Sequence, residues 1–387
     1  MKKQLDEMIG RCLQNGDFVG ANAAVYQDGK CLYANSFGMA DREAGRPMTE
    51  DTIFRIYSMT KPVTATAVMQ LVERGLLHTD MPVSWFLPEF GELQVYDENG
   101  VPHKAQNELR IQHLLNMQSG LPYPGCMNQT QRDVDAFFQE MERVRDTAGA
   151  VTTREFCRNI AKIPLEFEPG THWNYGISAD ILGGVVEAVT GMSYRDYLHR
   201  NIFEPLGMTE TDFYVHPDQL DRFAAAYEPI GGALVRDENC HLGLNDRRTL
   251  PAFISGGAGL TSTITDYAKF ANTLANGGTS PDGVRILSKA AFDFMRTPQV
   301  CGEAFRRDQE WDSLRGYDYG ALVRVLTDPK TAGTIANTGE FGWDGWTGTY
   351  FCVDPKEKLT ILFWIQVACA GTSNCAKLMR NIVYGAL

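Results

Sequence analysis

The chain has 387 residues, of which 44% are apolar and 22% charged, the composition of an ordinary globular protein. Its formal net charge is -12, which disfavours nucleic acid and anionic membranes as partners, because both require a surface rich in Lys and Arg. A chain of this length exceeds what one hydrophobic core supports, so we expect two core-bearing parts.

Residues 3–13 have helical spacing and do not resemble a signal peptide, because Asp6, Glu7 and Arg11 interrupt any apolar run. The nine cysteines include no Cys-x-x-Cys pair, which indicates reduced thiols and favours a cytoplasmic location. The seven histidines show no metal-binding spacing. We therefore expect no metal site, and nothing in the sequence calls for a cofactor.

A strand pair is predicted for residues 17–41, with the turn at Asp28-Gly29, a dipeptide that supplies positive φ. The middle of the chain has helix-like runs, at residues 62–74, 131–144, 153–163, 179–189 and 194–202. Near the far end, residues 348–353 and 359–367 are predicted strands, and residues 374–384 are a predicted helix. The apolar stretch 359–370 is too short to cross a bilayer as a helix and is interpreted as a buried strand.

Strand-rich ends around a helical middle predict an α+β fold, in which both termini build one antiparallel sheet flanked by helices. The sheet domain would comprise residues 1–57 and 250–387. A mostly helical domain would comprise residues 58–249, with the active site between the two domains. The sequence does not exclude a homo-oligomer.

The motif Ser58-Met59-Thr60-Lys61 has the spacing of a nucleophile and its base. Pro62 is tolerated only in a first helical turn, so the helix should begin at about Ser58, where its N-terminus favours a developing negative charge. Residues three apart share a helix face, which brings the Lys61 amine to the Ser58 hydroxyl. The motif alone does not distinguish a catalytic role from a structural one, since Ser58 could be a helix N-cap and Lys61 a solvated side chain.

Around this motif, the chain resembles the serine β-lactamase and penicillin-binding-protein superfamily, and within it the family VIII carboxylesterases. The nucleophile block DTIFRIYSMTKP starts at residue 51, and LVERGL follows at residue 71. Four further blocks follow in the family's order: IQHLLNMQSGL from residue 111, PGTHWNY from 169, GGAGLTST from 256 and GEFGWDG from 339. The resemblance spans nearly the whole chain and implies a β-lactamase/transpeptidase-like fold.

This resemblance implies that Ser58 is the nucleophile, Lys61 its proton acceptor and Tyr175 a second general base or acid. It also implies an oxyanion hole formed by the backbone N–H groups of Ser58 and Trp346. An isolated tyrosine is commonly structural, so the alternative for Tyr175 is a packed core phenol near Trp173.

Two departures from the penicillin-recognising members bear on the substrate. Ile177 stands where they carry the Asn of Tyr-x-Asn, and Trp343-Asp344-Gly345 stands where they carry Lys-Thr-Gly. Losing that cation weakens the attraction for β-lactam or peptide carboxylates, so β-lactamase activity should be weak or absent. Ile177, Trp343, Asp344 and Gly345 are the expected substrate-binding residues, although Asp344 could equally point away from the site.

The expected function is a serine esterase that forms an acyl-enzyme with small-molecule esters or amides. An acyltransferase would use the same intermediate, and a D-amino-acid amidase or peptidase is a third outcome within the fold. A non-catalytic scaffold is the alternative from another class, because a fold does not prove a function. The presence of Ser58, Lys61 and Tyr175 together argues against the scaffold.

Overall fold

The computed structural model describes residues 1–239, 241–300 and 312–387. Its α-helices are α1 (Lys2–Gln14), α2 (Thr60–Glu73), α3 (Ile111–Leu115), α4 (Gln129–Val144), α5 (Thr153–Ile160), α6 (Ser178–Thr190), α7 (Tyr194–Leu198), α8 (Glu204–Leu206), α9 (Ile264–Ala275), α10 (Lys289–Met295) and α12 (Asn374–Tyr384). Within the described residues, no helix has both the length and the apolar character required to cross a membrane.

The main sheet has eight strands in the order β10-β11-β12-β13-β14-β1-β2-β3. These strands are β1 (Gly20–Gln27), β2 (Lys30–Asp41), β3 (Arg46–Pro47), β10 (Tyr317–Tyr319), β11 (Arg324–Leu326), β12 (Phe341–Asp344), β13 (Thr349–Asp354) and β14 (Leu359–Trp364). Short two-stranded sheets pair β4 (Ile53–Arg55) with β9 (Thr261–Thr263), β5 (Gln94–Tyr96) with β6 (Pro102–Lys104), and β7 (Ala226–Ile230) with β8 (Ala233–Asp237).

The two ends of the chain meet in the middle of this sheet. Strand β1 pairs antiparallel with β14, from Asn22 opposite Trp364 to Gln27 opposite Leu359. Asp28 and Gly29 both have positive φ, at 49° and 74°, as the predicted hairpin turn between β1 and β2 requires. The predicted α+β class, with an antiparallel sheet built from both termini, is confirmed.

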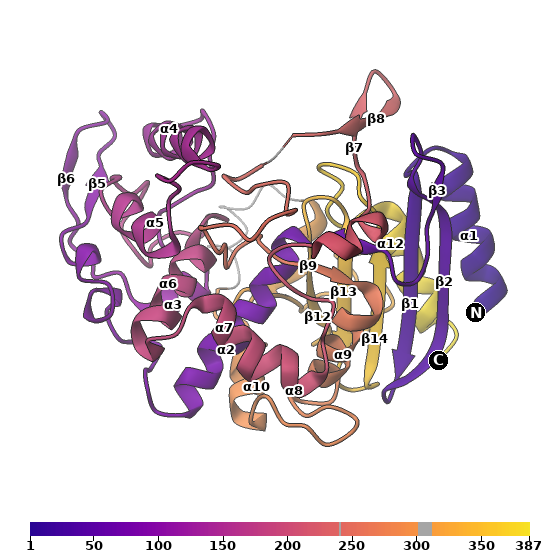
Figure 1. The fold of residues 1–387 in the computed structure, drawn as a ribbon. Helices are drawn as coiled ribbons and strands as arrows, with labels where there is room; N and C mark the ends of the chain where they lie inside the picture. The colour runs from indigo at the N-terminus through magenta and orange to yellow at the C-terminus, as the bar shows by residue number, and fades with distance from the viewer. Residues whose placement is uncertain (240, 301–311) are drawn as a thin grey trace.

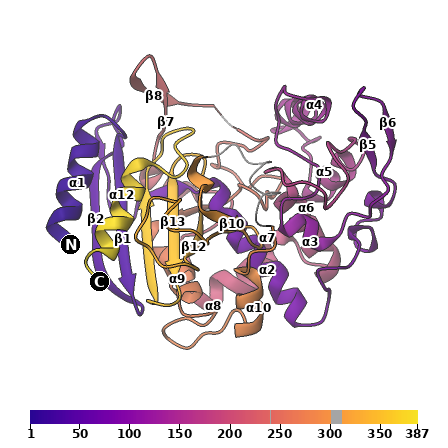
Figure 2. The same ribbon diagram turned by 180° about the vertical axis from the view of Figure 1, so that it is seen from behind.

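Helices cover both faces of the sheet (Figures 1 and 2). Ile361 and Phe363 of β14 pack in one cluster with residues of α1 and α12. The alternate residues Leu362 and Trp364 lie in the larger cluster that includes α9 and α2. Because both faces are buried, β14 is a continuous apolar run, and it ends at Trp364, before the predicted end of the strand.

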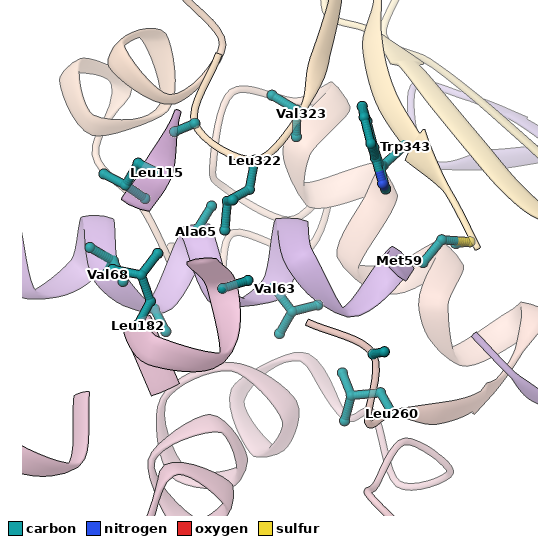
Figure 3. Close-up of a cluster of buried hydrophobic side chains, with 14 of the residues drawn as sticks. Met59, Val63, Ala65, Val68, Leu115, Leu182, Leu260, Leu322, Val323 and Trp343 are labelled. Atoms are coloured by element: carbon teal, nitrogen blue, oxygen red, sulfur yellow. The ribbon is translucent and has the colours of Figure 1, made fainter. Parts of the chain in front are cut away.

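Helix α2 lies at the centre of the larger cluster. Met59, Val63 and Val68 pack among residues from α3, α6 and the loop before β11, including Leu115, Leu182, Leu322 and Val323 (Figure 3). This enclosure explains why α2 is buried over nearly its whole length. The same packing holds α2 in place, and with it the start of the helix that directly follows Ser58. The predicted domain boundaries at residues 57/58 and 249/250 stay a prediction.

Candidate active site

Ser58 lies in a single 3₁₀ turn, Tyr57–Met59, that leads directly into α2. The regular helix begins at Thr60, two residues later than expected, and Pro62 lies in its first turn as expected. Tyr57 has φ +43°, an unfavourable value for an aromatic residue, and packs against Trp346 and Arg247. The chain therefore turns sharply just before Ser58, a residue that is 8% exposed and lines a cavity.

The Lys61 amine is fully buried and contacts three oxygen atoms. Nζ lies 3.1 Å from Ser58 Oγ, 2.7 Å from Tyr123 Oη and 2.9 Å from the Gly257 carbonyl oxygen. An ammonium has three N–H donors for these oxygens, whereas a neutral amine has two donors and one lone pair. In the neutral state one hydroxyl must turn to donate to Nζ, and only Ser58 or Tyr123 can do so.

Burial lowers the pKa of Lys61 from 10.5 to about 7, because the ammonium loses its hydration. The negative charges of Asp180 and Asp344 act in the opposite direction and limit the fall. Near neutral pH a substantial fraction of Lys61 is therefore uncharged, the form in which it can accept a proton.

Two tyrosines flank this amine. Nζ lies 4.6 Å from the ring centre of Tyr175 and 5.2 Å from that of Tyr123. Burial raises the pKa of both phenols well above 10, so both keep their protons at neutral pH. Tyr123 was not predicted from the sequence, although it follows the block at residues 111–121 between two prolines.

Trp343 and Ile177 lie deeper than expected. Both are buried, and neither lines the cavity that contains Ser58. The Trp343 indole donates to Tyr175 Oη at 2.9 Å, so it orients the phenol. Gly345 also lies behind the cavity: a Cβ there would come within 2.4 Å of the Ile56 carbonyl oxygen, which explains the glycine.

Asp344 faces the cavity, the orientation that the sequence left open. Its Oδ2 accepts a hydrogen bond from the buried guanidinium of Arg324 at 2.9 Å and another from Thr372. An ion pair with a buried partner balances the charge of this carboxylate. Asp344 therefore adds an acceptor oxygen to the cavity wall with little net charge.

Hydrogen bonds to Asp180 hold the Gly257 backbone in place, with its carbonyl oxygen against the Lys61 amine. The buried carboxylate of Asp180 accepts hydrogen bonds from Ser255 Oγ at 2.5 Å and from the Gly257 N–H at 3.0 Å. A Cβ on Gly257 would lie 2.6 Å from Asp180 Oδ2, so only glycine permits this approach. The family block at residues 256–263 thus positions backbone atoms against α6 and the amine.

Two histidines in the family blocks, His113 and His172, have structural contacts. His113 Nδ1 accepts a hydrogen bond from the Arg110 N–H at 3.2 Å, and His172 lies beside Thr171. Burial lowers the pKa of His113 to about 4, so it is uncharged at neutral pH. Among the residues that the structure describes, no cluster of three or more His, Cys, Asp or Glu side chains could hold a metal ion.

The cavity over Ser58 has a volume of about 770 Å³. It is enclosed by α4, by the loops that carry Tyr123 and Tyr175, and by residues from the end of β12 and the segment after β14. Its lining residues are Ser58, Tyr123, Pro124, Asp135, Phe138, Gln139, Glu142, Tyr175, His241, Leu242, Ser313, Asp344, Trp346, Cys369, Ala370, Gly371 and Thr372. A small-molecule substrate fits a cavity of this size.

Comparisons with known proteins show which family the chain belongs to. The family model described as beta-lactamase matches residues 5–375. Esterase EstB of Burkholderia gladioli is 32% identical, over 98% of this chain and 94% of its own. Acyltransferase calJ of Penicillium decumbens is 28% identical, over 86% of this chain and 80% of its own.

The fold is shared with a solved structure described as EstCE1, a hydrolase with promiscuous acyltransferase activity. The TM-score is 0.82 at 26% identity, over 99% of this chain and 98% of that chain. The resemblance inferred from the ordered sequence blocks is thereby confirmed, and the chain belongs to the beta-lactamase family.

Proposed function

We propose that this protein is a serine esterase that hydrolyses small carboxylic esters through an acyl-enzyme on Ser58. The observation that carries the proposal is the hydrogen bond of 3.1 Å between Ser58 Oγ and a fully buried Lys61, whose pKa is lowered to about 7. A serine hydroxyl is a weak nucleophile at neutral pH and needs an adjacent base that is unprotonated; for a lysine this is the neutral amine, and this pair meets that requirement.

In the proposed acylation, Ser58 Oγ attacks the ester carbonyl carbon while its proton moves to Lys61 Nζ. The backbone N–H groups of Ser58 and Trp346 stabilise the oxyanion of the tetrahedral intermediate. The alcohol leaves with a proton that originates from the Lys61 ammonium. Water then attacks the acyl carbon while Lys61 accepts a proton from it; the bond between the acyl carbon and Ser58 Oγ breaks, the proton on Lys61 passes to Oγ, and the acid is released.

Tyr175 and Tyr123 would act as protonated phenols in this scheme, because burial raises both pKa values. A phenol beside the Lys61 amine can pass a proton to the leaving alcohol and recover one from the ammonium. Tyr123 has the direct contact with Nζ, at 2.7 Å, and Tyr175 is oriented by Trp343. We therefore add Tyr123 to the predicted set of Ser58, Lys61 and Tyr175.

The segment Trp343-Asp344-Gly345 supports esters without an anionic group near the reacting carbonyl. No cation stands at position 343, and the nearby charge of Arg324 is taken up by Asp344. A β-lactam or a peptide carboxylate would therefore find little attraction at this edge of the cavity.

The second candidate is acyl transfer to an alcohol or amine. It is favoured by the similarity to acyltransferase calJ and to EstCE1, whose description names promiscuous acyltransferase activity. Both outcomes share the Ser58 acyl-enzyme and differ only in what attacks it.

The test compares wild type, Ser58→Ala and a control variant, Ser36→Ala, on strand β2 outside the cavity. Substrates are short-chain p-nitrophenyl esters, a chromogenic cephalosporin and a D-amino-acid amide, each with and without an added alcohol or amine. We expect ester hydrolysis and fluorophosphonate labelling in wild type and Ser36→Ala, and neither in Ser58→Ala. Cephalosporin turnover faster than ester turnover would refute the esterase, and a product formed only with an acceptor would favour the transferase.

We also infer that the protein works in the cytoplasm. The seven cysteines in the described residues are free thiols, which fits a reducing compartment.

A further inference from the structure

The cavity over Ser58 carries an uneven distribution of charge. Three carboxylates line it: Asp135 and Glu142 from α4, and Asp344 from the end of β12. No Lys or Arg is among its described lining residues, and His241 is the single imidazole there. The described lining of this cavity is therefore acidic.

Helix α4 provides the uncompensated part of this charge. Asp135, Gln139 and Glu142 are spaced at i, i+4 and i+7, so they share the face that lines the cavity. Neither Asp135 nor Glu142 forms an ion pair within the described chain, and Asp135 accepts one hydrogen bond, from Gln139. By contrast, Glu140 pairs with Arg143 at 2.6 Å and lies outside the cavity.

Aromatic rings provide the second feature. Tyr123, Tyr175 and Trp346 line the cavity beside Ser58. The first two already hold the Lys61 amine over their rings, at 5.2 Å and 4.6 Å from the ring centres. Aromatic faces attract cations through the ring quadrupole, most strongly where water is excluded, and quaternary ammonium groups are recognised in this way.

A cavity with aromatic walls and two carboxylates that form no ion pair within the described residues favours a ligand with an apolar body and a positive charge. We propose that the preferred substrates of this site are esters that carry an ammonium group, held against the aromatic walls and attracted by Asp135 and Glu142. This inference rests on the proposed esterase function and names its substrate class.

The charge could lie in the alcohol or in the acyl part of the ester, and two isosteric pairs distinguish these sources. Butyrylcholine is compared with 3,3-dimethylbutyl butyrate, in which carbon replaces the charged nitrogen of the alcohol. The p-nitrophenyl ester of 4-(trimethylammonio)butyrate is compared with that of 5,5-dimethylhexanoate, in which the same replacement is made in the acyl chain. Each pair keeps shape and size while changing only charge.

For wild type at low salt, we expect kcat/KM of the charged ester to exceed that of its isostere by about tenfold in at least one pair. The preference should shrink in 0.5 M salt, at roughly a 4 Å Debye length, because the carboxylates are open to solvent. The double variant Asp135→Asn/Glu142→Gln should lose about threefold or more of the preference, measured as the ratio of kcat/KM within each pair. Glu142→Lys changes the charge by the same two units and should lower the preference by a similar factor, and the control Glu140→Gln should leave the preference unchanged.

Equal rates within both pairs in wild type would overturn the inference, as would a preference that neither salt nor the α4 variants reduce. These outcomes are separate from failure of the esterase itself. If the neutral isosteres are not hydrolysed in a Ser58-dependent manner, the proposed function fails. If they are hydrolysed as fast as the charged esters, only the substrate class fails.

Discussion

Replacing Lys61 with methionine should change the free energy of unfolding in a pH-dependent way. The difference between Lys61→Met and wild type should favour the variant more at acidic pH than at alkaline pH. Methionine has a similar length and no charge, so Lys61→Met removes the burial of an ammonium. The folded-state pKa of Lys61 is about 7, whereas the ordinary value is 10.5. At 1.36 kcal/mol per pH unit, this difference corresponds to a cost of about 5 kcal/mol to the wild-type fold below pH 7.

The sign follows from proton binding. Between pH 7 and 10.5 the unfolded chain holds a proton on this lysine that the folded chain has lost, so wild-type stability rises with pH in this window. The cost is about 5 kcal/mol at pH 6 and about 2 kcal/mol at pH 9, so the stability of wild type relative to Lys61→Met should change by about 3 kcal/mol. The lost contacts to Tyr123 and Gly257 lower the variant's stability equally at both pH values, and this term cancels from the change.

The assay is urea unfolding of wild type and Lys61→Met at pH 6, 7.5 and 9, followed by tryptophan fluorescence and circular dichroism. Lys104→Met serves as the control, because Lys104 is exposed and its pair with Glu92 is on the surface. A stability difference for Lys61→Met that does not depend on pH would refute the assignment of a depressed pKa to this amine.

Three further predictions concern the surroundings of the amine. The kcat/KM of wild type should rise with pH through about 7, since Lys61 must lose its proton to act as a base; a rate that is flat from pH 5.5 to 8.5 would contradict this. Gly257→Ala should reduce ester turnover at least tenfold and lower the thermal midpoint, because its Cβ would meet Asp180 Oδ2 at 2.6 Å; wild-type turnover would show that this contact is not required. Arg324→Met should destabilise the fold by about 3 kcal/mol or more in urea unfolding, because it leaves the Asp344 carboxylate unpaired, and adding Asp344→Asn should recover part of the loss.

Much of the fold could be predicted from local signals. The Asp28-Gly29 turn predicted the β1–β2 hairpin, and burial of both faces of β14 explains an apolar run that predicted a central strand. Strands β10 and β11 were not predicted, because each has three residues, too few for a period of two to appear. Strand β11 is fixed by pairing with β12, a contact that is not local in the sequence, and β10 in turn pairs with β11.

Part of the site could also be predicted, because one of its central contacts is local in the sequence. Ser58 and Lys61 are three residues apart, so helix geometry predicts their contact from the sequence. Tyr123 reaches the amine from 62 positions away, and a lone tyrosine gives no periodic signal. Asp180 lay inside a predicted helix, where a carboxylate usually indicates a solvated face rather than a buried support for Gly257.

The pairing of the first strand with the last one has a consequence for biosynthesis. Ser58 and Lys61 leave the ribosome early, but the Trp346 segment and the strand β14 that pairs with β1 come more than 280 residues later. Lys61 acquires its low pKa only when the Gly257 carbonyl and its neighbours enclose it. On a nascent chain that lacks these later segments the lysine remains hydrated and protonated, so the proposed nucleophile becomes reactive only after the Gly257 and Trp346 segments have been made and packed.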